Sequence, residues 1–389
     1  MSEPNLAASP ERRLRLGMVG GGQGGFIGAV HRLAARLDDA WELVAAAPSS
    51  NPERARASGA DLRLAADRVY TDFHAMALAE AARSDAIDAV AIVVPNHLHF
   101  EVARAFLEAG IHVICDKPLT TTLADGQALL ALASRKQLLF ALTHNYSGYP
   151  LVRAAREMVR RGDVGELRIV QVEYAQDWLA QPIEASGQKQ AAWRTDPALA
   201  GPTGCLGDIG SHAAHLAEYV SGQSPSAVSA DLATFVAGRR VDDHVQVQLR
   251  YANGARGMLW ASQVASGEEN GLRLRVYGSL GALRWQQEQP NQLWQAQPGQ
   301  PARLWTRGMP GLPDEASAAT RLPAGHPEGF IEALAQIYRD FAADLHQHLR
   351  GEPATTPRVP GLADGIRSLA FIETVLESHR LNGAWQALG

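Results

Sequence analysis

Residues 14–28 of this 389-residue chain read LRLGMVGGGQGGFIG, and this stretch decides the fold of the first part of the sequence. A short apolar run, 14–19, leads into a glycine loop, and a helical pattern, 26–37, follows the loop. Gly20, Gly22 and Gly25 satisfy the spacing G-x-G-x-x-G. Backbone without Cβ atoms, at the N-terminus of a helix, is what a dinucleotide pyrophosphate needs. A flexible turn is the alternative, but the place of the loop after a strand favours dinucleotide binding.

The alternation of buried strands and helices continues to about residue 145. Apolar runs at 43–47, 89–94, 111–115 and 138–142, with a weaker run near Val69, predict strands, and stretches at 73–82, 100–109 and 123–134 predict helices. Strands that are apolar on both faces and are linked by helices are typical of a parallel sheet covered on both sides. We therefore predict a doubly wound α/β domain of the Rossmann type over residues 14–148, after a disordered N-terminal tail, 1–13.

The pattern changes after Pro150. A helix is predicted at 151–161, and apolar and polar residues then alternate at 170–174, 245–249 and 272–276. A period of two is typical of an antiparallel sheet that packs on one side only. We predict an α+β domain over 149–389, with a long loop at 286–325 and closing helices at 329–350 and 362–380 that can pack back on the first domain. The open face of the sheet would expose a large apolar patch, so we expect a homodimer or homotetramer.

Composition and charge restrict the partners. The chain is 46% hydrophobic and 20% charged, with a net charge of −5, which is typical of a soluble globular protein. The mild acidity and the lack of a block of Lys or Arg argue against nucleic acid as a partner. The sequence has no 18-residue apolar stretch, so we predict no membrane span. Only two cysteines, Cys115 and Cys205, fit a reducing, cytoplasmic location. Arg12 and Arg13 leave a twin-arginine export signal as the alternative.

The cofactor is predicted from residues that follow the strands, since ligands of open α/β sheets bind at the carboxyl ends of strands. After the second strand the chain reads APSSNPER, 47–54, with no acid at the strand tip for the ribose 2′-hydroxyl of NAD. Ser49, Ser50 and Arg54 suit a 2′-phosphate, which favours NADP slightly, unless Arg54 is an ordinary solvated helix residue. The other candidate cofactor-binding residues are Gln23, Gly24, Phe26, Ile27, Pro95, Asn96, His97, His99, Asp116, Lys117 and Asn145.

Two segments carry side chains suited to catalysis. Lys117 leaves a buried strand directly before a proline, in DKP at 116–118. In GCLGDIGSH, 204–212, Asp208 and His212 lie on one helical face if the helix begins near Asp208. The alternative is that Asp208 caps the helix and His212 is a partly buried surface residue. Asp208, His212 and His215 are neighbours on the predicted helix and could be considered as metal ligands. Zinc catalysis needs a third strong ligand with supporting second-shell contacts, which we do not find, so we predict no metal.

Together these segments resemble the Gfo/Idh/MocA family of sugar and polyol oxidoreductases. The resemblance rests on the glycine loop, on PNH at 95–97, on DKP where the family has Glu-Lys-Pro, on Asp208-x-x-x-His212, and on the closing stretch 364–385. The glycine loop is longer than the common family form. The segments 176–178, 193–197 and 326–329 resemble the branch that oxidises pyranosides, such as levoglucosan and glucoside 3-dehydrogenases, and inositol dehydrogenases are the other similar branch.

The resemblance implies an NAD(P)-dependent dehydrogenase that acts on a secondary alcohol of a sugar, glycoside, anhydrosugar or inositol. It implies Lys117, Asp208 and His212 as the catalytic set, with His212 taking the hydroxyl proton and Lys117 holding the same oxygen. The predicted substrate site consists of these three with Tyr146, Trp193, Arg194 and His215. Two alternatives are the transient use of bound NAD(P) for epimerisation, isomerisation or glycoside cleavage, and a non-catalytic, NAD(P)-sensing regulator.

Overall fold

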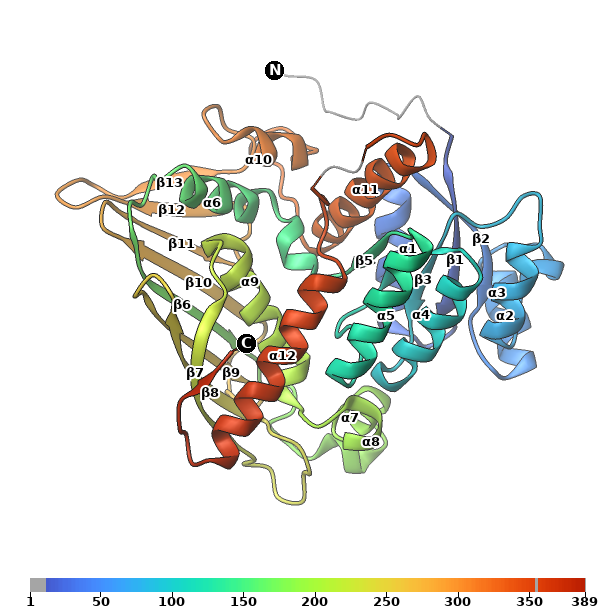
Figure 1. Cartoon of the computed structure of the whole chain (residues 1–389), viewed down its shortest axis with the longest axis horizontal. Helices are drawn as coiled ribbons and strands as arrows, with labels where there is room; N and C mark the ends of the chain where they lie inside the picture. Colours follow the sequence, from blue (N-terminus) through green and yellow to red (C-terminus); the bar gives the residue numbers. More distant parts are fainter. Residues whose placement is uncertain (1–11, 354–355, 389) are drawn as a thin grey trace. The chain divides into compact units, whose positions relative to one another are not determined.

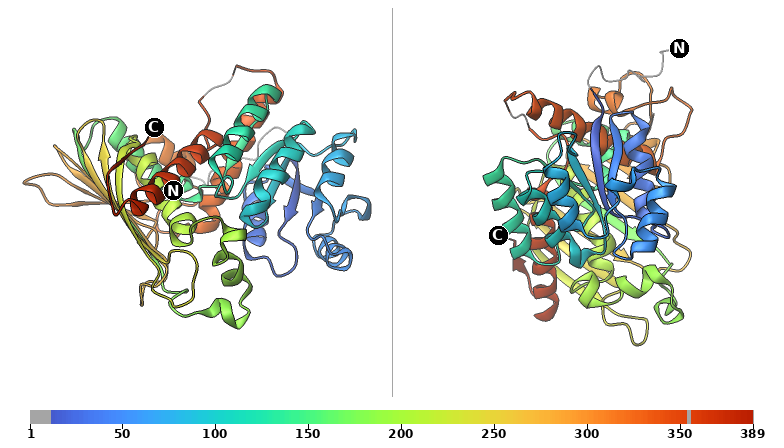
Figure 2. Two further views of the ribbon diagram at one scale, coloured as in Figure 1. Left: turned by 60° about the horizontal axis from the view of Figure 1, so that its bottom comes forward. Right: turned by 90° about the vertical axis from the view of Figure 1, so that its right-hand side faces the viewer.

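The computed structural model describes residues 12–353 and 356–388, so residues 1–11 of the predicted tail lie outside the described part. The described residues form two compact units (Figures 1 and 2). The N-terminal unit consists of residues 12–145 and 334–366, and the C-terminal unit of residues 146–333 and 367–388. Residues 334–366 therefore group with the N-terminal unit, whereas the predicted boundary placed them in the second domain.

The N-terminal unit contains a five-stranded parallel sheet in the order β2-β1-β3-β4-β5. Its strands are β1 (Leu14–Gly20), β2 (Trp41–Ala47), β3 (Ala89–Val93), β4 (His112–Cys115) and β5 (Phe140–Leu142). Its helices include α1 (Phe26–Leu37), α2 (Pro52–Asp61), α3 (Phe73–Ala81), α4 (His99–Glu108) and α5 (Leu123–Lys136). Every residue of β3 is buried, so both faces of the sheet are covered there. The predicted fold class is confirmed, but the expected strand near Val69 is only a single bridge to Ala46.

The helix α11 (Phe330–Leu349) contributes its residues from 334 onward to the N-terminal unit. The indole nitrogen of Trp41 donates to the backbone oxygen of Tyr338 at 2.9 Å, and the rings of Trp41 and Phe341 stack at 6.1 Å. The hydroxyl of Tyr338 lies 2.9 Å from Nδ1 of His31 on α1. This part of α11 is thus tied to β2 and α1 by buried side chains.

The C-terminal unit is built on a nine-stranded sheet in the order β13-β12-β11-β10-β6-β9-β8-β7-β14. Only the β6–β9 pair is parallel. The strands are β6 (Leu167–Ala175), β7 (Pro225–Ala233), β8 (His244–Tyr251), β9 (Arg256–Ser262), β10 (Gly271–Gly278), β11 (Ala282–Gln286), β12 (Gln292–Ala296), β13 (Arg303–Thr306) and β14 (Gln386–Ala387). The helices include α6 (Pro150–Arg160), α7 (Lys189–Arg194), α8 (Pro197–Ala200), α9 (Ser211–Ser221), α10 (Asp314–Ala319) and, from residue 367 onward, α12 (Leu362–Arg380). The long loop expected at 286–325 is wrong, because β12, β13 and α10 lie there.

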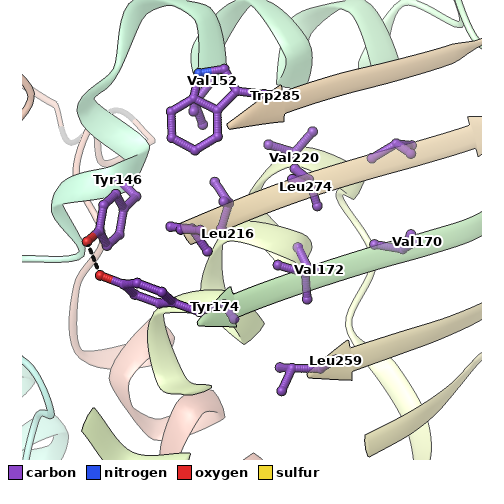
Figure 3. Close-up of a cluster of buried hydrophobic side chains, with 14 of the residues drawn as sticks. Tyr146, Val152, Val170, Val172, Tyr174, Leu216, Val220, Leu259, Leu274 and Trp285 are labelled. Carbon is purple, nitrogen blue, oxygen red and sulfur yellow. Dashed lines mark hydrogen bonds between the residues drawn. The ribbon is translucent and has the colours of Figure 1, made fainter. Parts of the chain in front are cut away.

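One face of this sheet forms the core of the unit. Val170, Val172 and Tyr174 on β6 are buried with Leu272 and Leu274 on β10, as the alternating pattern predicts. Apolar residues of α6 and α9 complete the cluster, including Val152, Leu216 and Val220 (Figure 3). The other face is not one large apolar patch. Gln246, Gln248 and Arg250 of β8 are exposed on it. The exposed apolar residues there include Ile169, Met258, Trp294 and Leu304.

The segment 326–329, part of the resemblance to pyranoside dehydrogenases, has a structural role. Glu328 forms a buried ion pair with Arg307, with 2.8 Å between Oε1 and Nη1. The same oxygen accepts the backbone N–H groups of Arg321 and Leu322. A buried carboxylate with these partners fixes the course of the chain between β13 and α11. No helix among the residues that the structure describes is long and apolar enough to cross a membrane.

A buried histidine makes the stability of the N-terminal unit depend on pH. His112 opens β4, its Nδ1 accepts the N–H of Leu139 at 2.9 Å, and its ring meets that of His348 edge-on. Burial, with a smaller contribution from His348, lowers the pKa of His112 to about 4. The folded pKa is below the unfolded value, so the associated stability is present above about pH 6.5 and is lost as pH falls toward 4.

We expect His112→Asn to remove this dependence, because the Asn side-chain oxygen can still accept the N–H of Leu139. Between pH 7 and pH 4, the wild-type chain should lose about 3 kcal/mol more free energy of unfolding than the variant. Urea unfolding of both proteins at the two pH values measures the difference. Parallel losses in the two proteins would contradict this assignment.

Candidate functional site

The predicted cofactor-binding residues of the N-terminal unit follow the carboxyl ends of parallel strands. The glycine loop follows β1, Ser49 and Ser50 follow β2, and residues 95–97 follow β3. Asp116 and Lys117 follow β4, and Asn145 comes shortly after β5. Because all five strands are parallel, these segments share one edge of the sheet. The structure therefore brings together the segments that the sequence placed at strand ends.

The glycine loop depends on a backbone contact that the G-x-G-x-x-G spacing does not include. A Cβ atom built on Gly28 would lie 2.3 Å from Cα of Gly21, so only glycine lets α1 approach the end of β1 so closely. Gly21 has φ +67°, and its oxygen accepts a 2.6 Å hydrogen bond from Arg32 on α1. Gly21 and Gly28 are thus required by backbone packing, and the predicted set did not include them. The glycine-rich stretch 20–28 was the signal.

Gln23 ties the tip of the loop to α2. Its backbone N–H donates to Oγ of Ser58 at 3.1 Å, and its side-chain amide donates to Asp61 at 2.7 Å. A Cβ atom on Gly22 would lie 2.6 Å from the oxygen of Pro48, so the loop also packs closely on the end of β2. A hollow of about 400 Å³ lies beside the loop, lined by residues 21–26, Ala29, Arg32, Ser58, Asp61 and Leu62. A hollow bordered by glycine backbone at the N-terminus of α1 fits a dinucleotide.

The residues after β2 have local hydrogen bonds. Asn51 caps α2, since its side-chain oxygen accepts the N–H of Arg54 at 3.0 Å, and Oγ of Ser49 accepts the N–H of Asn51 at 3.2 Å. The side chain of Arg54 is exposed on the first turn of α2. Its exposure is compatible both with binding a 2′-phosphate and with the solvated helix residue given as the alternative.

His99 joins two of the loops at the strand ends. Its ring nitrogens lie 2.6 Å from the oxygen of Pro118 and 3.0 Å from that of Val94. The ring is buried, and desolvation lowers its pKa. Both nitrogens face backbone carbonyl oxygens, and the neutral ring donates to one of the two. This placement indicates that His99 holds the loops, while His97 is exposed.

Asp116 connects Lys117 to the buried interior of the N-terminal unit. Its Oδ1 accepts the N–H of Lys117 at 3.0 Å and the hydroxyl of Thr143 at 2.8 Å. Nε2 of His31, fully buried on α1, lies 4.0 Å from the same oxygen. Burial lowers the pKa of His31, although the charge of Asp116 acts in the opposite direction. The half-buried Lys117 is thereby fixed through its own backbone.

Asn145 offers a polar group toward a ligand. It is 5% exposed, and its buried Nδ2 has no hydrogen-bond partner among the described residues. A buried donor without a protein acceptor is costly unless a ligand or water satisfies it. This donor supports the fit of the N-terminal unit to a polar cofactor.

In the C-terminal unit, Asp208 lies on a π-helical turn, Leu206–Gly210, that leads into α9. The prediction of an ordinary α-helical start near Asp208 is therefore corrected. Oδ2 of Asp208 accepts the side-chain amide of Gln263 at 2.9 Å and lies 3.4 Å from Nε of Arg194. Arg194 is held by Gln190 at 2.5 Å. Asp208 is thus oriented by two side chains, and Gln263 carried no signal in the sequence.

His212 lies against two buried tyrosines, whose positions Figure 3 shows. Its ring meets that of Tyr146 edge-on at 4.9 Å and lies 6.4 Å from that of Tyr174. The two tyrosine hydroxyls are 2.5 Å apart, and the hydroxyl of Tyr174 donates to Asn270 at 2.8 Å. Burial raises the pKa of Tyr146 to about 12, so its hydroxyl stays protonated at neutral pH. A rigid polar network therefore lies behind the imidazole.

The remaining predicted substrate residues have different surroundings. Tyr146 is 3% exposed and stacks on Tyr149, which favours core packing over stacking on a sugar. Trp193 is half-buried, with the guanidinium of Arg194 4.2 Å from its ring centre. His215 is buried and stacks on Tyr219. Within residues 12–353 and 356–388, no three His, Cys, Asp or Glu side chains are grouped to hold a metal ion.

The contact of Gly28 with Gly21 predicts a specific defect. In Gly28→Ala the added methyl group collides with backbone that cannot move without opening the loop, so NAD(P) affinity should fall at least tenfold. Fluorescence titration with the cofactor measures this loss. The matched control is Gly110→Ala, where a left-handed glycine ends α4 with open space around it. The control should cost about 1 kcal/mol of stability without changing the affinity, and equal affinity loss in both variants would refute the role of Gly28.

Comparisons with known proteins agree with this architecture. The family model described as the NAD-binding Rossmann fold of the oxidoreductase family matches residues 14–144, and the GFO/IDH/MocA C-terminal domain matches residues 152–284. Levoglucosan dehydrogenase of Pseudarthrobacter phenanthrenivorans is 30% identical over 72% of this chain and 76% of its own.

Two solved structures are similar over almost the whole chain. An oxidoreductase from Sinorhizobium meliloti is 48% identical, covers 97% of this chain and 100% of its own, and has a TM-score of 0.87. An inositol dehydrogenase homologue from Azotobacter vinelandii, solved with NAD⁺, is 36% identical, covers 98% of this chain and 99% of its own, and has a TM-score of 0.95. Another structure of an inositol dehydrogenase homologue from Azotobacter vinelandii, solved with NADH and myo-inositol, is 34% identical, covers 97% of this chain and 98% of its own, and has a TM-score of 0.91. The chain belongs to the Gfo/Idh/MocA family of NAD-binding oxidoreductases.

Proposed function

We propose that this protein is an NAD(P)-dependent dehydrogenase that transfers hydride between the nicotinamide and a secondary alcohol of a sugar, glycoside, anhydrosugar or inositol. The observation that carries the proposal is the surroundings of Asp208 and His212. Gln263 and Arg194 orient the carboxylate, and the buried tyrosine pair supports the imidazole. Relatives that are named for levoglucosan, or solved with myo-inositol, support a cyclic polyol as the substrate class.

The proposed roles follow from the chemistry of alcohol oxidation. A secondary alcohol is a very weak acid, so its hydroxyl proton must be taken as the carbonyl forms. His212 takes that proton, and Asp208 orients the substrate and stabilises the charged imidazole. Lys117 holds the substrate oxygen through hydrogen bonding and positive charge. The bound nicotinamide supplies the hydride acceptor.

The proposed substrate contacts extend beyond these three residues. Arg194, which already lies beside Asp208, and the half-buried Trp193 are the side chains best suited to contact a ring hydroxyl or a ring face. Tyr146 and His215 are buried, so we assign them to the support of the site. The homodimer or homotetramer and the cytoplasmic location stay predictions.

An absorbance screen at the NAD(P)H band, with levoglucosan, glucosides, inositols and free aldoses, tests the proposal. Lys117→Ala and His212→Ala should each reduce turnover about 10²- to 10⁴-fold, and His212→Ala should leave the dissociation constant of the cofactor within a few-fold of wild type. The control is Lys136→Ala, an exposed lysine on α5, which should keep full turnover. Unchanged turnover in either active-site variant would remove that residue from the mechanism. Product formation without stoichiometric NAD(P)H would point instead to transient oxidation.

The finer proposal of NADP rests on Ser49, Ser50 and Arg54 after β2. A guanidinium that pairs with a 2′-phosphate contributes only to NADP binding, so Arg54→Ala should weaken NADP roughly tenfold and leave NAD unchanged. Arg56→Ala, another exposed arginine on α2, is the matched control. Calorimetric titration with each cofactor measures both constants. An equal affinity for NADP before and after Arg54→Ala would show that Arg54 is an ordinary helix residue.

A further inference from the structure

Asp242 is a buried acid with no part in the proposed chemistry. It lies between β7 and β8, is 8% exposed, and faces the segment that precedes the π-helical turn. Its Oδ1 accepts the N–H of Gly204 at 2.7 Å, and its Oδ2 accepts the N–H of Leu206 at 2.7 Å. Its backbone oxygen accepts the N–H of Cys205 between them at 2.9 Å. One residue therefore binds three consecutive backbone N–H groups.

These N–H groups belong to the start of the helical segment that carries the proposed catalytic residues. The first N–H groups of a helix have no partner within the helix, and a side chain at the N-cap usually accepts them. Here the N-cap residue of the π-helical turn, Cys205, makes no side-chain cap, and Asp242 supplies the acceptors from another segment. Negative charge is also favoured at a helix N-terminus. Asp242 therefore acts as an N-cap contributed by another segment of the chain.

The fit between the two segments is too close to allow a shift. A Cβ atom on Gly204 would lie 2.4 Å from the oxygen of Asp242 and 2.6 Å from Cγ2 of Val241. Burial raises the pKa of Asp242 to about 6, so the group is mainly ionised at neutral pH and both of its oxygens accept. The contact thus fixes where the helical segment begins and how it is turned.

The same stretch holds Asp208 by a second route. The backbone oxygen of Asp243 accepts the N–H of Gln263 at 2.9 Å, and the side chain of Gln263 donates to Asp208. This second contact uses the backbone oxygen of residue 243 and not its side chain, so it does not depend on the Asp243 carboxylate.

We propose that Asp242 is a positioning residue that fixes the start and rotation of the helical segment 205–221 and thereby aims Asp208 and His212 at the substrate. The inference rests on the proposed function for the roles of Asp208 and His212. The contacts of Asp242 stand independently of that function.

The variant that tests it is Asp242→Asn, and the chain supplies a matched control in Asp243→Asn. An amide nitrogen at position 242 would face a backbone N–H instead of accepting it, so one donor is left without a partner. Asp243 is also buried, and its carboxylate accepts the N–H groups of Phe235 and Val236 and pairs with Arg239. Both variants remove one buried carboxylate from the same stretch, but only the first releases the helical segment.

Two measurements decide the proposal. Hydrogen–deuterium exchange of the peptide 203–212 should be at least tenfold faster in Asp242→Asn and unchanged in Asp243→Asn. With a substrate from the screen, kcat/KM should fall roughly 10- to 100-fold in Asp242→Asn, with an unchanged cofactor dissociation constant, and should stay within threefold of wild type in Asp243→Asn. If Asp242→Asn does not fold, Gly204→Ala serves as the second variant. Its methyl group would collide with the backbone oxygen of Asp242 while the carboxylate stays in place, so it should show the same faster exchange and lower kcat/KM.

Each outcome has a definite meaning. Unchanged exchange in Asp242→Asn would overturn the proposal, and so would equal loss of kcat/KM in both aspartate variants. Faster exchange with unchanged kcat/KM would also overturn it, because the released segment would not matter for catalysis. A wild-type chain that oxidises none of the polyols would contradict the proposed function instead, and the exchange measurement would then decide the contact of Asp242 alone.

Discussion

The contact between the backbones of Gly21 and Gly28 is the constraint on which the N-terminal unit depends. Since a methyl group on Gly28 would sit 2.3 Å from Cα of Gly21, the first turn of α1 and the end of β1 touch backbone to backbone. This close approach of the two backbones sets the position of α1 relative to β1. His31, one turn further along α1, is thereby brought to 4.0 Å from Asp116 at the end of β4. A single small residue thus relates the cofactor loop to the strand end that carries Lys117.

A common device holds the proposed catalytic residues in both units. Oδ1 of Asp116 accepts the backbone N–H of Lys117, and Oδ2 of Asp242 accepts that of Leu206, two residues before Asp208. In each case a carboxylate holds the backbone at, or two residues before, a proposed catalytic residue. Hydrogen bonds to an ionised acceptor are stronger than neutral ones, and a buried donor that loses its acceptor is costly. The carboxylates therefore fix the backbone from which the proposed catalytic side chains project.

The sequence predicted those parts of the fold where one periodicity dominates. The helix at 26–37 and the helix at 362–380 have the bounds expected from their patterns, and the strands of the parallel sheet lie within a few residues of the apolar runs. The segment 286–325 was mispredicted because β12 has a single buried residue, Leu293, and β13 has none. Pairing with β11 holds β12, and pairing with β12 holds the edge strand β13, and a local sequence pattern does not reveal such pairing. The strand predicted near Val69 was wrong for the opposite reason. The local sequence is apolar, but Val69 forms only a single bridge, to Ala46.

The candidate site was predictable to the extent that chemistry restricts residue type. A base, a cation and a glycine loop each require particular side chains, so Lys117, Asp208 and His212 could be selected by type and position. The groups that hold them are less restricted, because an acceptor for a backbone N–H can come from many residues. Asp242 and Asp243 are identical neighbours in sequence, yet one binds residues 204–206 and the other binds residues 235–239. Only the pairing of segments some forty residues apart distinguishes them. The precision of the site therefore depends on contacts that tertiary structure creates, whereas its chemistry depends on residues that the sequence displays.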